Sequence, residues 1–185
     1  MITRILLTSL LVLFIGPTFF AKGSTLQKRD HLTPQEVDLV KDARALDKRI
    51  EVFIKAAERR LMVINNSSAA NAKQLKKDSE KWGELPTGSR AELVLDIARI
   101  LDEAITNIDD VSTRDERNPL IAKSLRKLAT AVNTMMAELK PMSVEAKGDA
   151  EIASFELLNE DAQSILEAVT KLPPEVEKKA KAKNK

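Results

Sequence analysis

The sequence predicts an all-α protein whose body, residues 33–172, is an antiparallel four-helix bundle. The composition is 43 % hydrophobic and 31 % charged, with 5 glycines and 7 prolines, which is typical of helical proteins. Aromatic residues make up 3 % of the 185-residue chain, which disfavours a sandwich or barrel. Four segments carry apolar residues at spacings of three and four, the period of an amphipathic helix. Helices with such spacing pack as a bundle.

The first 23 residues have the layout of a secretory signal peptide. Arg4 supplies a short basic region, and the apolar run ILLTSLLVLFI follows it. Cleavage after Gly23 places Ala21 at the −3 position. An uncleaved membrane anchor is the alternative, although a spanning helix needs about 20 apolar residues. We therefore predict export to the periplasm or the extracellular space, with residues 24–32 as an N-terminal extension.

The first helix is predicted to run from residue 34 to about residue 65. Its start is a capping box, with Thr33 as the N-cap, Pro34 as the first helical residue and Glu36 as the returning acid. The apolar positions that follow are Leu39, Ala43, Leu46, Ile50, Phe53 and Ala57. Residues 67–88 have little apolar face and are predicted to be a weakly structured connection.

Three further helices complete the predicted bundle. A second capping box starts the helix over 90–110, and an Asn-Pro pair starts the next at residue 119. Pro141 ends that third helix, Ser143 caps the fourth, and the fourth ends at Leu172. An elongated, partly open helical array completed as a homodimer is the structural alternative.

The charge distribution excludes a nucleic-acid-binding domain. Without residues 1–23 the chain has 28 basic and 28 acidic residues. Residues 171–185 carry a net charge of +4, so residues 24–170 carry −4 and show no basic face. The tail, residues 173–185, is predicted to be disordered. Its lysines could bind anionic lipid headgroups or cell-wall polymer weakly, and a merely solubilising tail is the alternative.

The sequence predicts no enzyme, metal site or cofactor. The chain has no cysteine, which excludes disulfides, thiol catalysis and covalently attached c-type haem. His31, the single histidine, lies just outside the first helix, where it is expected to be solvated, whereas metal sites in bundles need ligands that project inward. The carboxylate pairs that lie closest in the sequence are typical of solvated helix surface. They are Asp109 with Asp110, Asp115 with Glu116, and Glu156 with Glu160.

Four residues are candidates for binding a protein partner. Arg49, Arg59 and Arg60 fall on the polar side of the first predicted helix, where they either form a docking face or simply cover water-facing surface. Trp82 lies in the weak connection. It is predicted either to close one end of the bundle together with Leu85 or to anchor a partner, a role that favours tryptophan.

Two resemblances bear on function. The stretch LTPQE followed by DKRIEVFIKAAERRL resembles the first helix of uncharacterised exported helical proteins of bacteria, which implies no activity. Leu32 and Thr33 also match the L-T-x-x-Q motif of the periplasmic Spy/CpxP stress chaperones, with Glu36 in place of the glutamine. We expect an exported, non-catalytic protein that binds an unknown protein partner in the cell envelope, and a Spy/CpxP-like chaperone or stress sensor is the alternative.

Overall fold

The computed structural model describes residues 29–67 and 72–173 of the chain. Within these residues the fold is all-helical, with six helices and no strand, which confirms the predicted fold class. The helices are α1 (Pro34–Asp42), α2 (Leu46–Ile64), α3 (Ala72–Trp82), α4 (Arg90–Arg114), α5 (Pro119–Val144) and α6 (Asp149–Thr170). The predicted signal peptide and nearly all of the lysine-rich tail lie outside the described residues.

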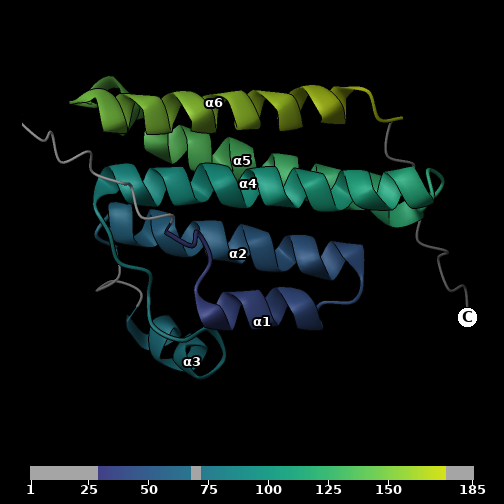
Figure 1. Ribbon diagram of the computed structural model, residues 1–185, viewed down its shortest axis with the longest axis horizontal. Helices are drawn as coiled ribbons and strands as arrows, with labels where there is room; N and C mark the ends of the chain where they lie inside the picture. Colours follow the sequence, from purple (N-terminus) through teal and green to yellow (C-terminus); the bar gives the residue numbers. More distant parts are fainter. Residues whose placement is uncertain (1–28, 68–71, 174–185) are drawn as a thin grey trace, which may run out of the picture.

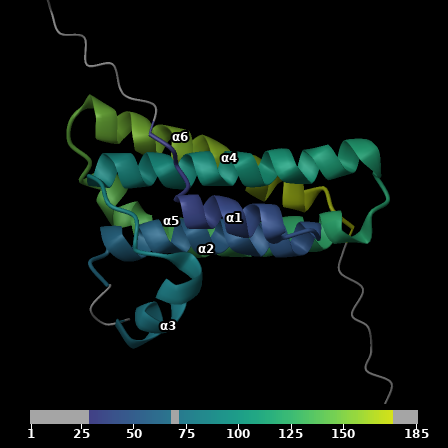
Figure 2. The ribbon, with the colours of Figure 1, turned by 60° about the horizontal axis from the view of Figure 1, so that its bottom comes forward.

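Four long helices lie lengthwise side by side and enclose the core (Figure 1). Helix α4 packs against α2 and α6, and α5 packs against the same two helices from the other side. Helix α1 lies along α2, and α3 contacts α1 at the edge of the molecule (Figures 1 and 2). The arrangement is compatible with a helical bundle to which α1 and α3 are added on one side.

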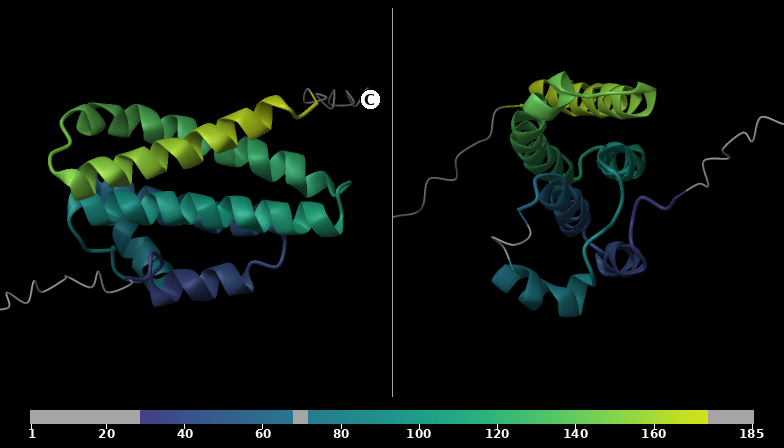
Figure 3. Two further views of the ribbon diagram at one scale, coloured as in Figure 1. Left: turned by 45° about the horizontal axis from the view of Figure 1, so that its top comes forward. Right: turned by 90° about the vertical axis from the view of Figure 1, so that its left-hand side faces the viewer.

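The direction of neighbouring helices follows from their contacts. Asp47 pairs with Lys123 near the start of α2, and Asn65 bonds Glu138 near its end. The residue numbers rise together, so α2 and α5 run in the same direction. Figure 3 shows that α5 and α6 run in opposite directions. Because α2 and α5 are parallel neighbours, these contacts do not confirm the predicted antiparallel four-helix arrangement.

The first predicted helix is two helices, and the prediction of one continuous helix over residues 34–65 was wrong. The backbone leaves the helical conformation at Ala43 and Ala45. The amide of Ala43 still donates to the carbonyl of Leu39, while the Nε of Arg49 donates to the carbonyl of Ala43 at 3.2 Å. These bonds satisfy polar groups that the break exposes. The break lets α1 fold back along α2 (Figure 1).

The prediction for residues 141–149 was also wrong. Pro141 does not end α5, because the helix continues to Val144 and includes Ser143, the predicted cap of the next helix. Pro141 is exposed, and Met142 packs against the core, which holds this last turn in place. The next helix starts at Asp149, after Gly148 with a φ of +82°, a left-handed conformation that glycine adopts readily.

The predicted caps of three helices are confirmed. The amide of Glu36 donates to Thr33 Oγ1 at 3.3 Å, and the amide of Thr33 donates to Glu36 Oε2 at 2.9 Å. Ser89 and Glu92 make the same reciprocal pair at the start of α4. The amide of Leu120 donates to the side chain of Asn118, the N-cap of α5. These starts are encoded locally, because each cap involves residues two or three apart.

Among the described residues, one buried serine hydroxyl is expected to lower the stability of the fold. Ser124 on α5 is fully buried, and its Oγ has no hydrogen-bond partner among the described residues. A buried polar group without a partner costs free energy. We expect Ser124→Ala to raise the free energy of unfolding by about 1 kcal/mol in urea denaturation. The exposed Ser143→Ala is the control, and a loss of stability in Ser124→Ala would show that the hydroxyl is satisfied.

Candidate functional site

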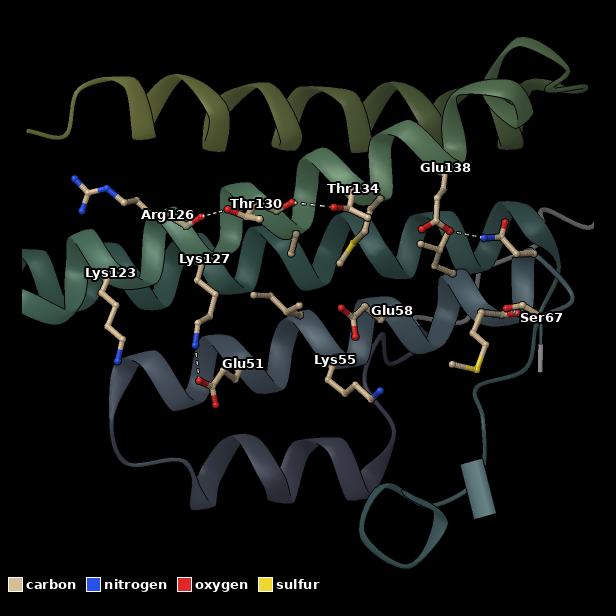
Figure 4. A pocket seen from close by; sticks show the side chains of 16 residues that line it. Glu51, Lys55, Glu58, Ser67, Lys123, Arg126, Lys127, Thr130, Thr134 and Glu138 are labelled. Atoms are coloured by element: carbon tan, nitrogen blue, oxygen red, sulfur yellow. Dashed lines mark hydrogen bonds and ion pairs between the residues drawn. The ribbon is translucent and has the colours of Figure 1, made fainter. Parts of the chain in front are cut away.

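A groove of about 890 Å³ with an apolar floor lies between α2 and α5 (Figure 4). Side chains of both helices alternate along its length. The floor residues are Ile54, Leu61, Met62, Ala131 and Met135. The groove is open to solvent, and polar or charged side chains flank the floor. An open apolar floor with a polar rim is the surface type that binds other molecules.

One end of the groove is basic. Lys123, Arg126 and Lys127 lie on one side of α5 and line this end. The Nζ of Lys123 lies 2.6 Å from Asp47 Oδ2, and Lys127 pairs with Glu51. Hydrogen bonding from Lys127 holds the pKa of Glu51 below its ordinary value, and a bond from Lys48 acts in the same direction. This end therefore stays charged around neutral pH, with acids of α2 holding the lysines in place.

The other end of the groove is acidic. Glu58 and Glu138 both lie among the groove side chains (Figure 4). Partial burial raises the pKa of Glu58, Lys55 opposes this effect, and the charge of Glu138 adds to it. Lys55 pairs with Asp78 at 3.7 Å, and the partner of Glu138 is the neutral amide of Asn65. Neither Glu58 nor Glu138 therefore forms an ion pair with a lysine or arginine of the described chain.

The groove was not identified from the sequence. One sequence signal could have indicated the α5 wall of the groove. It is a stripe of polar residues on α5, beside the apolar stripe, at positions 123, 126, 127, 130, 134 and 138. The spacing of three and four places these side chains on one helix face. Its pairing with α2, which lies about 70 residues earlier, depends on the tertiary fold.

Arg59 and Arg60 are buried, so their predicted place on the water-facing side was wrong. Each side chain is 1 % exposed, and both bind the carboxylate of Glu36, which is fully buried. Arg59 Nε lies 3.2 Å from Glu36 Oε1, and Arg60 donates to both carboxylate oxygens at 2.8 Å. The physical reason is the break before α2, because α1 covers this side of α2 and brings Glu36 onto the two arginines.

The same cluster binds the connection between α3 and α4. The Nη2 of Arg59 donates to the carbonyls of Trp82, Gly83 and Glu84 at 2.5–3.2 Å. Trp82 is 9 % exposed, and the Arg59 guanidinium lies 5.8 Å from the centroid of its ring. This cation–π contact stabilises the packing of the Arg59 guanidinium against the Trp82 ring. Trp82 thus fixes α3 to Arg59 rather than presenting its ring to a partner.

Arg49 and His31 are both half-buried. Arg49 bonds Asn107 on α4 at 2.9 Å in addition to the carbonyl at the α1–α2 break. Its role in partner binding stays a prediction. His31 was expected to be solvated, but its Nε2 lies 2.7 Å from Glu103 Oε2 and its carbonyl accepts a bond from Arg60. The N-terminal segment is therefore attached to both α2 and α4.

Asp161 on α6 is partly buried and lies near two other acids, Asp102 on α4 and Glu160. Burial, together with the charges of Asp102 and Glu160, raises the pKa of Asp161 to about 6. A folded-state pKa above the ordinary value of 3.8 means that the folded chain binds this proton more tightly than the unfolded chain. The stability of the folded state should therefore decrease as the pH rises from about 4 through 6.

We expect Asp161→Asn to remove this pH dependence and to raise the free energy of unfolding at pH 8 by about 1 kcal/mol, a value reduced by solvent screening. Urea denaturation of the parent and variant chains at pH 5 and pH 8 measures the effect. Glu156→Gln, an exposed acid of the same helix, is the control. If Asp161→Asn and the parent lose equal stability between the two pH values, Asp161 does not carry the effect.

No group of three or more acids and histidines in residues 29–67 and 72–173 is arranged to hold a metal ion. Across the same part of the chain, every helix is too short or too polar to span a bilayer.

The described fold and groove define a helical protein with an open groove between two of its helices. Comparisons of the chain with protein-family models, with curated proteins and with solved structures found no match in any of the three. The two resemblances drawn from the first helix therefore stay predictions.

Proposed function

We propose that the chain is an exported, non-catalytic helical protein that acts by protein–protein contact in the cell envelope, with the α2–α5 groove as its binding surface. The observation that supports the proposal most strongly is the apolar floor of the groove between a basic and an acidic end. Residues 1–23 are the proposed signal peptide.

Photo-crosslinking in cells tests the groove as the binding surface. A photo-reactive amino acid replaces Thr134, which is exposed and lines the groove, or Gln163, which is exposed on α6. We expect one adduct of defined size from position 134 and none from position 163. Ala131→Trp, which fills the floor, should remove the adduct without lowering the unfolding temperature.

The outcomes separate the candidate functions. Adducts with many partially unfolded proteins, together with suppression of heat aggregation of a test protein, would favour the chaperone alternative. Adducts formed only with further copies of the chain would overturn binding of a different partner. Equal labelling from positions 134 and 163 would overturn the groove as the binding surface.

Export has its own test. The mass of the chain recovered from the envelope should correspond to a start at Ser24. Residues 1–23 fused to an alkaline phosphatase that is active only outside the cytoplasm should give activity, and a variant with Leu10→Arg and Leu11→Arg in the apolar run should not. A recovered chain that begins at Met1 would overturn cleavage.

A further inference from the structure

The described chain ends beside the groove. Arg126, which lines its basic end, donates from Nη2 to the carbonyl of Pro173, the last described residue. Twelve residues of the chain follow, with the sequence PEVEKKAKAKNK. This segment, residues 174–185, therefore starts at the basic end of the groove.

The order of charges in this segment is opposite to the order of charges in the groove. Its two acids, Glu175 and Glu177, come first, and its five lysines follow from Lys178 onward. In the groove the bases of α5 come first, next to Pro173, and the acids Glu58 and Glu138 lie beyond them. A segment laid along the groove from Pro173 places acid against base and then lysine against acid. Val176 and two alanines are available for the apolar floor.

The segment is long enough to cover the groove. Arg126 and Glu138 are twelve positions apart on α5, which corresponds to about 18 Å along the helix. An extended chain covers at most about 3.3–3.6 Å per residue, so five residues reach about 17 Å. Lys178 is the fifth residue after Pro173, and the later lysines extend the reach. The lysines can therefore reach Glu58 and Glu138, the two acids of the groove lining that lack an ion-pair partner in the described chain.

We propose that residues 174–185 bind in the α2–α5 groove of their own chain, with Glu175 and Glu177 on the lysines of α5 and the lysines from Lys178 onward on Glu58 and Glu138. This inference rests on the groove as the proposed binding surface. The segment then acts as an internal competitor that a protein partner has to displace.

Disulfide formation tests the proposal in the full chain, which has no cysteine of its own. Ala180→Cys is combined with Thr134→Cys in the groove or with Gln163→Cys on α6. Thr134 lies about 12 Å along α5 from Arg126, and Gln163 lies about 10 Å along α6 from the end of that helix. The two positions are therefore at similar distances from the start of the segment. The α6 control is stringent, because acids surround Gln163 and would attract the lysines without any groove.

We expect the effective concentration of the two thiols, measured against glutathione, to be at least about tenfold higher for the Thr134 pair than for the Gln163 pair. Glu58→Gln with Glu138→Gln should remove most of this difference. The double variant Glu156→Gln with Glu160→Gln removes two negative charges from α6 instead. It should leave the difference between the two cysteine pairs unchanged.

Equal effective concentrations for the two cysteine pairs would overturn the proposal. A Thr134 pair that links mainly two chains would also overturn it, because the groove would then take the tail of a second copy. The proposed function can fail separately. If the two cysteine pairs have equal effective concentrations but position 134 gives a partner adduct, only the binding of residues 174–185 in the groove is overturned. If the Thr134 pair is clearly preferred but position 134 gives no adduct, only the binding of a partner is overturned.

Discussion

Replacing Glu36 by glutamine is expected to lower the free energy of unfolding by about 3–5 kcal/mol, the usual cost of removing one member of a buried ion pair. The carboxylate is fully buried and accepts bonds from Arg59 and Arg60, which are 1 % exposed. Glutamine keeps the size of the side chain but removes the carboxylate charge that both guanidinium groups share, which leaves Arg60 with Asp96 at 4.0 Å as its remaining buried acid. Urea denaturation followed by circular dichroism at pH 7 measures the loss.

The chain contains a matched control for this change. Glu92 occupies the same position in the capping box of α4 as Glu36 does in α1, but it is exposed. We expect Glu92→Gln to cost less than about 1 kcal/mol, because it weakens only the cap and a solvent-exposed ion pair with Arg29 at 3.9 Å. Equal losses in the two variants would show that Glu36 stabilises the fold as a cap and that its contacts with the two arginines add nothing.

Replacing Phe53 by alanine is expected to lower the free energy of unfolding by about 3–5 kcal/mol through the lost burial and the cavity left behind. Phe53 is fully buried in the middle of α2. The described core has only one other phenylalanine, Phe155, so no neighbouring ring is available to fill the space. The measurement is urea denaturation.

Ile152→Ala is the control for the core substitution, because this side chain is 42 % exposed on α6. It should change stability by less than about 0.5 kcal/mol. A loss below about 1 kcal/mol for Phe53→Ala would mean that the core closes around the cavity. The Phe53→Leu variant, which keeps most of the volume, should fall between the two.

The helix starts could be predicted because their determinants are local. Thr33 with Glu36, Ser89 with Glu92, and Asn118 each cap a helix through residues two or three positions away. The apolar spacing of three and four likewise predicts which side of each helix is buried. An all-helical fold follows from such local signals, since they occur in every long segment.

The buried ion cluster could not be predicted, because it depends on a break that the apolar pattern does not show. The spacing of apolar residues continues through Ala43 and into α2, so a single helix fits the sequence equally well. On a single helix Arg59 and Arg60 face water. Only when α1 folds back does Glu36, more than 20 residues earlier, become their partner.

The groove was missed for a related reason. Its two walls are formed by α2 and α5, and nothing in either helix alone shows that they become parallel neighbours. The polar stripe on α5 fits a solvated helix surface equally well. Pairs such as Asp47 with Lys123 are separated by 76 positions, so only the fold shows them.

The parallel pairing of α2 with α5 also determines when the groove forms. During synthesis α2 is complete at Ile64, whereas α5 is complete only at Val144, 80 residues later. At about 5–20 residues per second, this interval lasts roughly 4–16 s. During that time the apolar side chains of α2 have no second wall and form no groove. A partner that recognises both walls can therefore distinguish a finished chain from one still being made.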